Sequence, residues 1–284
     1  MSSGAAAGSS RGSGRSNLTL RILSALVVGA VALALTYLGG MPFRFFAAAV
    51  AGLVLYEWLA MRPAAGRLHR AVVWAVFAAS MAALVLGLSA PFLLAALGVA
   101  FAVALVHAAA TGQGAWSAFG IAYAGLPALA LAQLRGADEA GLVAILFLYA
   151  VVWATDIVAY FVGRSLGGPK LAPAISPGKT WSGAIGGAVG GTVAGVAVSS
   201  LAGAAIGLGA AFILALLLSV LSQVGDLFES ALKRRCGVKD SGAILPGHGG
   251  IMDRVDGLVA AAILLYLLGI VFSGLSAPAA LFSR

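Results

Sequence analysis

The sequence has little charge and almost no cysteine or histidine. Of its 284 residues 9% are charged, nine are acidic, three are histidines and one, Cys236, is a cysteine. A single cysteine excludes an intramolecular disulfide and a zinc site made of several cysteines. We interpret Cys236, at a basic helix end, as a bystander rather than a nucleophile.

Hydrophobic residues take the place of the missing charge. They make up 62% of the chain, and the mean hydropathy is +1.06. These values exclude an ordinary soluble domain and predict an all-α polytopic membrane protein. We interpret the net charge of +8 as a consequence of membrane topology and of anionic lipid or nucleotide partners. Nucleic-acid binding is not indicated, because no basic surface is interleaved with aromatic residues.

Hydrophobic segments of bilayer-spanning length recur along the chain. We expect about nine transmembrane helices in one integral membrane domain, residues 17–284, after a disordered tail at 1–16. The expected spans are 20–38, 45–60, 71–88, 91–110, 116–134, 141–163, 182–201, 205–225 and 257–275. Because so many hydrophobic segments follow the first, we expect the first to be a retained helix rather than a signal peptide.

The basic residues divide unevenly between the two ends of these spans. With the N-terminus in the cytoplasm, all but Arg44, Arg135 and Arg284 of the 17 lysines and arginines lie on the inner side. Basic loops stay inside, so we expect this orientation in the plasma membrane. It places two polar loops, 164–181 and 226–256, and a polar catalytic pocket on the cytoplasmic side, where nucleotide triphosphates are.

Charge is concentrated between Ser222 and Asp256. The charged residues there are Asp226, Glu229, Asp240, Asp253, Asp256, Lys233, Arg234, Arg235, Lys239 and Arg254. So dense a polar group between hydrophobic runs is destabilising unless its charges pair, bind ions or meet water. We interpret the stretch as a functional site; the alternative is a solvated loop with charge-paired helix ends.

The spacing of these acids predicts a cation site. Asp226, Glu229 and Lys233 would share one helix face, and Asp253 and Asp256 repeat the three-residue interval before the next span. Two carboxylate-bearing helix ends joined by a glycine-rich loop could converge on one hard cation. Mg²⁺ prefers carboxylates, water and substrate phosphates, and the neighbouring lysines and arginines suit phosphate oxygens.

Two further acids lie within hydrophobic segments. Asp156 is inside the sixth span, on one helix face with Tyr160 and Arg164. A carboxylate at that depth costs about 2.5–3.5 kcal/mol on insertion scales, which favours a position at a cavity, a cation or a basic partner. We interpret Glu57, near the inner end of the second span, as an interfacial residue, with a polar cavity as the alternative.

Prolines interrupt the segment between the sixth and seventh spans. Pro169, Pro173 and Pro177 exclude a continuous helix and predict a loop. Gly178-Lys179-Thr180 looks like the end of a phosphate-binding P-loop, but Pro173 replaces the first glycine of that motif and no strand precedes it. We therefore reject a P-loop here.

Glycines recur at every fourth position at the start of the seventh span, from Gly183 to Gly195. Small residues in this pattern let helices approach closely. The pattern predicts tight packing, either within the monomer or across a dimer.

The polar stretch resembles the signature of the phosphatidate cytidylyltransferases, also called CDP-diacylglycerol synthases. The matching residues are Ser230, Lys233, Arg234, Lys239, Asp240, Pro246 to Gly250, Asp253, Arg254 and Asp256, and every fixed position is filled. The pattern around Asp156 and the run Ser176-Pro177-x-Lys179-Thr180-Trp181 resemble upstream motifs of the same family. Gly178 and Ser182 depart from the family pattern, since a lysine and a glutamate are usual at these positions. We therefore expect phosphate binding to depend more on Lys179.

The resemblance implies an Mg²⁺-dependent nucleotidyltransferase of phospholipid biosynthesis. It would join CTP to phosphatidic acid, giving CDP-diacylglycerol and pyrophosphate. It also implies a second cation, such as K⁺, and a homodimer. The expected catalytic residues are Asp226, Asp253, Lys233, Lys239 and Arg254. The expected metal ligands are Asp226 and Asp253, with Asp256, Glu229 and Asp156 as further candidates. The expected substrate-binding residues are Lys179, Ser176, Thr180, Arg234, His248, Gly249, Gly250 and Arg164.

Two other classes compete with this assignment. A CTP-using polyprenol kinase shares parts of the polar stretch but would move the γ-phosphate to an alcohol; the complete match from Ser230 to Asp256 argues against it. A transporter would place its ionisable residues at mid-membrane in paired repeats. Here most lie in an expected loop, and no repeat is visible.

Overall fold

The structure is a computed structural model that describes residues 26–62, 66–244 and 249–283. The expected tail at 1–16, the start of the first expected span and His248 lie outside the described residues. The helices are Leu26–Leu38, α2 (Gly40–Ala60), α3 (Arg67–Leu86), α4 (Ala90–Ala110), α5 (Trp116–Arg135), α6 (Glu139–Leu166), α7 (Trp181–Leu201), α8 (Leu208–Arg235), α9 (Met252–Ser273) and the short η1 (Ala280–Phe282).

Eight of these helices, α2 to α9, are long and apolar enough to cross a membrane. The chain is therefore a multi-pass integral membrane protein, and the all-α prediction is confirmed. Of the first expected span, the structure describes the shorter helix Leu26–Leu38. Pro127, in the fifth expected span, lies inside the single helix α5.

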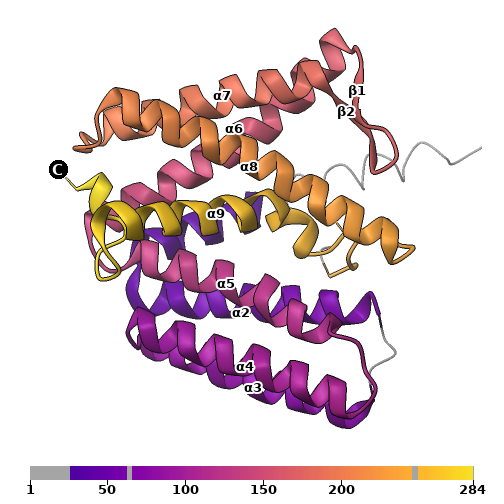
Figure 1. Cartoon of the computed structure of the whole chain (residues 1–284). Helices are drawn as coiled ribbons and strands as arrows, with labels where there is room; N and C mark the ends of the chain where they lie inside the picture. Colours follow the sequence, from indigo (N-terminus) through magenta and orange to yellow (C-terminus); the bar gives the residue numbers. More distant parts are fainter. Residues whose placement is uncertain (1–25, 63–65, 245–248, 284) are drawn as a thin grey trace, which may run out of the picture.

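The helices lie side by side, with α9 between two groups (Figure 1). On one side are α6, α7 and α8; on the other are α2 and α5, with α3 and α4 outermost. Helix α9 contacts α8, α5, α6 and α2, so both groups meet on it. The polar residues at its first turn therefore lie where the two groups converge.

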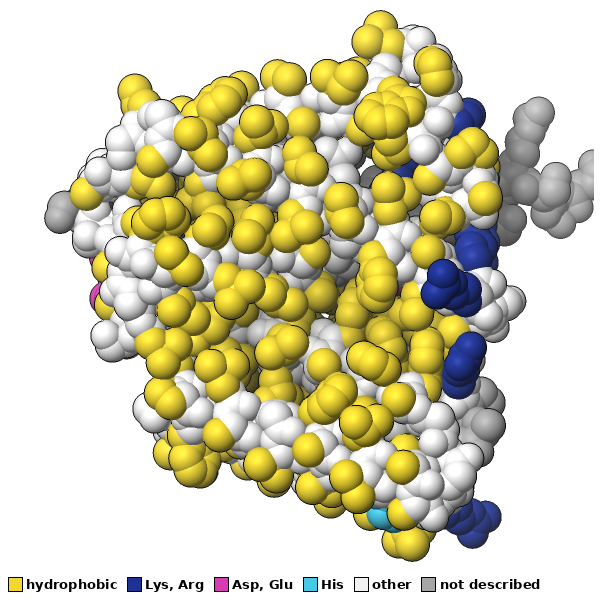
Figure 2. Space-filling view, in the orientation of Figure 1, with side chains coloured by type: hydrophobic (Ala, Val, Ile, Leu, Met, Phe, Trp, Pro, Cys, Tyr) yellow, Lys and Arg dark blue, Asp and Glu magenta, His cyan; other side chains and the backbone are white. Residues whose placement is uncertain are grey.

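One end of the bundle carries most of the visible positive charge. On the face shown in Figure 2, lysine and arginine side chains gather at one end, and that end carries the β1–β2 hairpin and the loop after α8. This distribution matches the uneven division of basic residues in the sequence.

Two helices extend further into the polar stretch than expected. Helix α8 continues ten residues beyond the expected end at 225, to Arg235, and α9 begins at Met252 rather than at 257. Leu227, Phe228 and Leu232 keep the helical spacing of apolar residues beyond Asp226. The helix ends where Cys236 caps it and Gly237 adopts a positive φ of 74°, a conformation that favours glycine after a helix.

The proline-containing segment forms a small hairpin rather than an irregular loop. Strand β1 (Lys170–Ala172) pairs antiparallel with β2 (Ser176–Thr180), with Lys170 opposite Thr180. The amide of Trp181 donates to the carbonyl of Pro169 and closes the base. Prolines favour extended backbone before them, so the same residues that exclude a helix permit these strands.

Helices α6 and α7 form the most extensive helix pair among the described elements. The glycine ladder faces α6: a Cβ on Gly187 would lie 2.8 Å from the carbonyl oxygen of Thr155, and one on Gly191 2.8 Å from that of Val151. No real side chain tolerates such contacts with backbone. The glycines thus serve packing within the monomer, which resolves the alternative left by the sequence.

Candidate active site

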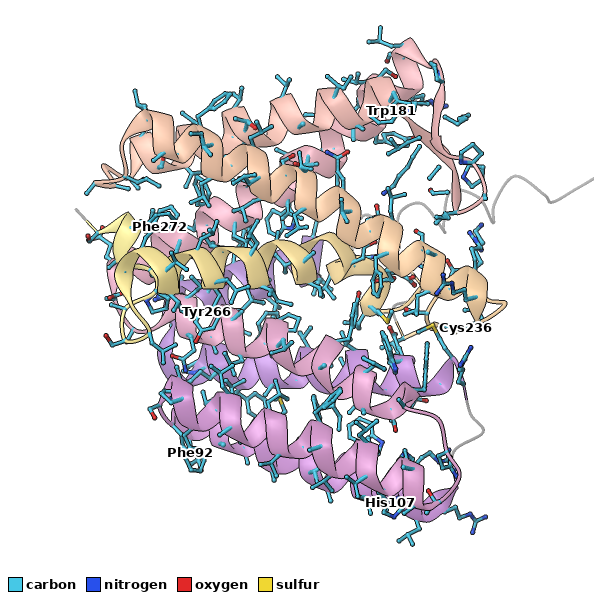
Figure 3. All side chains as sticks on the ribbon, in the orientation of Figure 1. Phe92, His107, Trp181, Cys236, Tyr266 and Phe272 are labelled. Atoms are coloured by element: carbon cyan, nitrogen blue, oxygen red, sulfur yellow. The ribbon has the colours of Figure 1, made fainter. Side chains whose placement is uncertain are left out.

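The start of α7 and the end of α8 lie at the same end of the bundle, as Trp181 and Cys236 show in Figure 3. The polar residues of the sequence motifs meet there in two groups. We call Asp156, Asp226, Asp256 and Lys179 the open cluster, because it borders a polar cavity. We call Glu57, Glu229, Asp253 and Lys233 the closed network, because its members are paired and largely buried.

The open cluster brings three helices and the hairpin together. Lys179 on β2 forms an ion pair with Asp226 Oδ2 on α8, and Ser230 Oγ lies 3.3 Å from Asp226 Oδ1. Asp156 on α6 and Asp256 on α9 both interact electrostatically with Asp226, and these negative charges repel one another. Such a concentration of like charge stabilises a cation bound among the carboxylates.

A cavity of about 690 Å³ opens beside this cluster. Its charged lining residues are Asp156, Arg164, Lys170, Lys179 and Asp226. Several glycines also line it, among them Gly178 and Gly183, so backbone amides can approach a ligand closely. Three cationic side chains beside two carboxylates suit a polyphosphate together with a metal ion.

The closed network is centred on Lys233. Its Nζ lies 3.0 Å from Glu229 Oε1 and 2.5 Å from Asp253 Oδ1. The other Asp253 oxygen, Oδ2, accepts from the amides of Gly250 at 2.9 Å and Ser241 at 3.1 Å. Glu229 is fully buried and Lys233 nearly so. Asp253 therefore ties the start of α9 to α8 and to the loop between them.

The interpretation of Glu57 as an interfacial residue is wrong. Glu57 is 1% exposed, and its carboxylate accepts from the amides of Ile251 at 2.9 Å and Met252 at 2.8 Å and from Ser241 Oγ at 2.9 Å. It thus satisfies amides at the start of α9, where a negative charge also offsets the helix dipole. The only sequence signal was an acid inside an apolar run.

Glycines make room for the Glu57 carboxylate. A Cβ on Gly250 would lie 2.4 Å from Glu57 Oε2, and one on Gly242 2.7 Å from Glu57 Oε1. Neither position therefore tolerates a side chain without displacing the carboxylate. The expected substrate-binding residue Gly250 is buried and donates its amide to Asp253, while Gly249 has a positive φ of 82°.

Tyr123 on α5 is a further site residue that the sequence did not single out. Its hydroxyl donates to Glu229 Oε2 at 3.2 Å, and its ring lies 5.0 Å from that of Trp58. Trp58 and Trp116 each donate a ring N–H to the other's backbone carbonyl, at 2.8 and 3.0 Å. These contacts hold α2 and α5 against the closed network.

The remaining expected substrate-binding residues are spread more widely. Thr180 lines the cavity but is buried and caps α7, since its hydroxyl accepts from the Gly183 amide at 3.1 Å. Arg164 also lines the cavity, and its Nη1 donates to the Tyr160 hydroxyl at 2.9 Å. Arg234 is exposed and reaches the hairpin carbonyl of Ile175 at 3.4 Å, and Lys239 is exposed in the turn after α8. Ser176 is on β2, paired with Ala172.

The donor chemistry of the open cluster fits a hard divalent cation. Within residues 26–62, 66–244 and 249–283, no group of three or more His, Cys, Asp or Glu side chains is arranged to hold a metal ion. A site for Mg²⁺ can be made with one or two carboxylates, completed by water and substrate phosphates. Asp226, with Asp156 and Asp256 near enough to interact with it electrostatically, offers carboxylates of that kind.

A cavity lined by both cationic and acidic side chains at one end of a membrane helix bundle is what a membrane enzyme acting on phosphates requires. Comparisons with known proteins specify the class. A sequence model described as the Cytidylyltransferase family matches residues 19–272. A phosphatidate cytidylyltransferase of Brucella suis is 50% identical over 270 residues, covering 94% of this chain and 98% of that protein. One of Bacillus subtilis is 44% identical over 141 residues, 50% of this chain and 52% of that protein.

The chain belongs to the cytidylyltransferase family. This confirms the resemblance drawn from its motifs, and the chain is a nucleotidyltransferase.

Proposed function

We infer that this membrane enzyme is a CTP:phosphatidate cytidylyltransferase, which forms CDP-diacylglycerol and pyrophosphate in phospholipid biosynthesis. The relatives of that name are similar over nearly the whole chain. The observation that carries the chemistry is the cavity of about 690 Å³ in which Arg164, Lys170 and Lys179 stand beside Asp156 and Asp226.

The reaction is a displacement at phosphorus. A phosphate oxygen of phosphatidate attacks the α-phosphorus of CTP; the new P–O bond forms as the bond to the β-phosphate oxygen breaks, and pyrophosphate leaves with its electrons. The second pKa of a phosphate monoester is about 6, so the nucleophile is anionic at neutral pH and needs no strong base. The protein's task is therefore positioning and charge neutralisation.

The cationic side chains divide this task by their positions. Lys179, Lys170 and Arg164 line the cavity and would bind the triphosphate oxygens. Arg254, at the start of α9, interacts electrostatically with Asp156 and would bind the lipid phosphate near the α-phosphorus. Arg234, Lys239, Ser176, His248 and Gly249 are proposed to complete the nucleotide site, while Thr180, Gly250 and Lys233 position the elements around it.

A divalent cation, which nucleotidyl transfer generally requires, would neutralise charge developing on the triphosphate. We propose Mg²⁺, held by Asp226 with Asp256 and Asp156. Asp253 and Glu229 are further candidates, although Lys233 now occupies their facing oxygens. Five carboxylates exceed what one Mg²⁺ takes from a protein, which supports a second cation, such as K⁺, near Asp156.

The basic end of the bundle supports a cytoplasm-facing active site in the plasma membrane. The hairpin and the loop after α8 lie at this end (Figure 1), and cytoplasmic segments carry the excess of lysine and arginine. A cysteine accessibility assay in intact cells tests the orientation. Labelling of Lys239→Cys, in a Cys236→Ser background, by a membrane-impermeant reagent before lysis would contradict it.

We also propose a homodimer. Because the glycine ladder packs against α6 inside the monomer, another lipid-facing surface would form the interface. Crosslinking in the native membrane tests this proposal, and a monomeric mass at all crosslinker concentrations would overturn it.

The deciding experiment follows the two phosphorus positions of CTP. The enzyme in detergent micelles receives phosphatidate and CTP labelled at the α- or the γ-phosphate, with and without Mg²⁺. We expect α-label in the lipid, only with Mg²⁺, and its near-complete loss in Asp226→Asn. Transfer of γ-label to an added polyprenol would instead indicate a kinase. Transfer of neither label would contradict the enzyme assignment and favour a transporter.

A further inference from the structure

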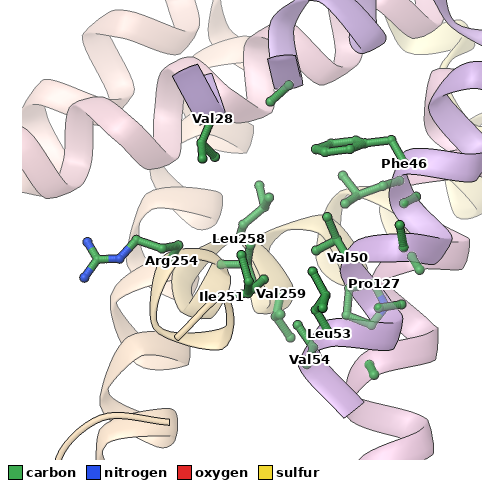
Figure 4. A pocket seen from close by; sticks show the side chains of 18 of the residues that line it. Val28, Phe46, Val50, Leu53, Val54, Pro127, Ile251, Arg254, Leu258 and Val259 are labelled. Carbon is green, nitrogen blue, oxygen red and sulfur yellow. The ribbon is translucent and has the colours of Figure 1, made fainter. Parts of the chain in front are cut away.

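A second cavity lies beside the active site and is almost wholly apolar (Figure 4). Its volume is about 380 Å³, and its lining comes from the helix Leu26–Leu38, α2, α5, α6 and α9. Val28, Phe46, Val50 and Leu258 illustrate this lining in Figure 4. The cavity is large enough for part of a small ligand but offers such a ligand few polar contacts.

Two lining residues connect this cavity to the reacting groups. Arg254 lies at its edge, with the guanidinium directed away from the apolar side chains (Figure 4). The same Arg254 interacts electrostatically with Asp156 in the open cluster. Tyr123 lines the cavity and donates its hydroxyl to Glu229 of the closed network at 3.2 Å. A ligand here would have an apolar part in the cavity and a charged part at Arg254.

We propose that this cavity holds one acyl chain of phosphatidate while Arg254 binds the headgroup phosphate. This inference rests on the proposed function. The occupant must be apolar along its length and anionic at one end, which excludes the nucleotide and fits the lipid substrate. Arg254 supplies the complementary charge, because a guanidinium binds phosphate oxygens in a fixed geometry.

The cavity selects by shape rather than by hydrophobicity. A bilayer is as apolar as the cavity wall, so moving a chain from one to the other gains little hydrophobic free energy. What the cavity provides is a fixed position for the chain, and with it a fixed approach of the phosphate to the neighbouring polar cavity. A substitution that fills the cavity should therefore discriminate between long and short acyl chains.

Val50→Trp on α2 tests this directly. Val50 lines the cavity two helical turns before Glu57 and is only partly buried. The matched control is Val99→Trp on α4, where the valine is 62% exposed and does not line the cavity. Turnover is measured in mixed micelles with dioleoyl or dihexanoyl phosphatidate at equal mole fraction, and KM is determined for CTP and for each lipid.

We expect Val50→Trp to raise KM for dioleoyl phosphatidate about tenfold, in the range that one misfitting group in an apolar pocket produces. The KM for dihexanoyl phosphatidate and for CTP should stay at the wild-type value, and Val99→Trp should change none of the three. Equal effects on both lipids, or no effect on either, would overturn the acyl-chain site. Wild-type enzyme that turns over neither lipid would instead contradict the proposed function.

A direct measurement covers the case in which Val50→Trp fails to fold. Wild-type enzyme is irradiated with phosphatidate carrying a diazirine at the end of one acyl chain, and the labelled peptides are mapped. Labels on cavity-lining peptides, such as those with Val50 or Leu131, reduced by unlabelled phosphatidate, would support the site. Labels confined to the outermost helices α3 and α4 would overturn it.

Discussion

Two carboxylates on helix α8, Asp226 and Glu229, have opposite surroundings although they are only three positions apart. Asp226 borders the polar cavity and its side chain is 26% exposed; Glu229 is fully buried against Lys233 and Tyr123. The open cluster around Asp226 has an excess of negative charge directed at a ligand site. The closed network around Glu229 has its oxygens occupied by protein donors.

This difference in surroundings indicates a structural role for one group of motif residues and a ligand-binding role for the other. The closed network fixes the loop between α8 and α9 and the start of α9, through Glu57, Asp253 and Lys233. The open cluster next to it has three carboxylates, Asp156, Asp226 and Asp256, and only Lys179 among its own members to offset them. The carboxylates of this motif thus have two different roles: those of the closed network hold protein elements together, and those of the open cluster face the ligand cavity. The four variants that follow test this contrast.

The largest effect is expected for Asp226→Asn. Loss of a proposed metal ligand should lower kcat at least about 10³-fold, roughly 4 kcal/mol of transition-state stabilisation, at saturating Mg²⁺. The control is Asp138→Asn, since Asp138 caps α6 at the other end of the bundle and asparagine caps equally well. Turnover of Asp226→Asn equal to that of Asp138→Asn would exclude Asp226 as a ligand.

The next largest effect is expected for Lys179→Gln. It removes the cation that faces Asp226 and lines the polar cavity, so kcat/KM for CTP should fall about 10²-fold. The KM for phosphatidate should change little. Arg235→Gln, an exposed residue near the end of α8, is the charge-matched control. A selective rise in the KM for phosphatidate would place Lys179 on the lipid phosphate instead.

A smaller catalytic effect but a larger structural one is expected for Glu57→Ala. It leaves the buried amide of Met252 without its acceptor, a loss of about 1–3 kcal/mol of unfolding free energy, and removes the acceptor of the partly buried Ile251 amide as well. Hydrogen exchange at these amides should accelerate and kcat should fall about tenfold as the geometry loosens. Glu57→Gln, which keeps one carbonyl acceptor, should lie between.

Glu139→Ala, an exposed acid in the first turn of α6, is the control for Glu57→Ala. It should leave exchange at Ile251 and Met252 unchanged. Unchanged exchange in Glu57→Ala as well would show that the carboxylate does not hold the start of α9.

The smallest effect is expected for Tyr123→Phe. The variant keeps the ring against Trp58 and removes one hydrogen bond to Glu229. The expected loss is about 0.5–1.5 kcal/mol in unfolding free energy. Thermal unfolding in detergent measures this loss. The control is Tyr56→Phe, since the Tyr56 side chain is 57% exposed. A loss of kcat as large as that of Asp226→Asn would show that Tyr123 takes part in the reaction and is not merely a structural member of the closed network.

The membrane class and the helices followed from the sequence, because bilayer thickness and backbone hydrogen bonding leave few alternatives to apolar helices. Helical spacing also placed Asp226, Glu229 and Lys233 on one helix. The division between open and closed carboxylates did not follow, since it depends on contacts between residues far apart in sequence. Glu57 contacts Ser241 and Met252, and Tyr123 contacts Glu229, and no local spacing encodes either pair.

The hairpin was missed for a related reason. Lys170–Ala172 and Ser176–Thr180 are short, carry prolines around them and lack the alternation of a half-buried strand. They pair because the ends of α6 and α7 are held close together by the glycine ladder.

The close packing of α6 on α7 has a consequence for how the protein is made. These two helices and the hairpin leave the ribosome one after the other, and their contacts join residues near in sequence, which form fast. We therefore expect the α6–hairpin–α7 unit to assemble during translation, with Asp156 and Lys179 already facing one cavity. Asp226 is synthesised later, on α8, and Asp256 and Arg254 follow on α9. The active site would therefore be complete only after α9 has packed against the other helices.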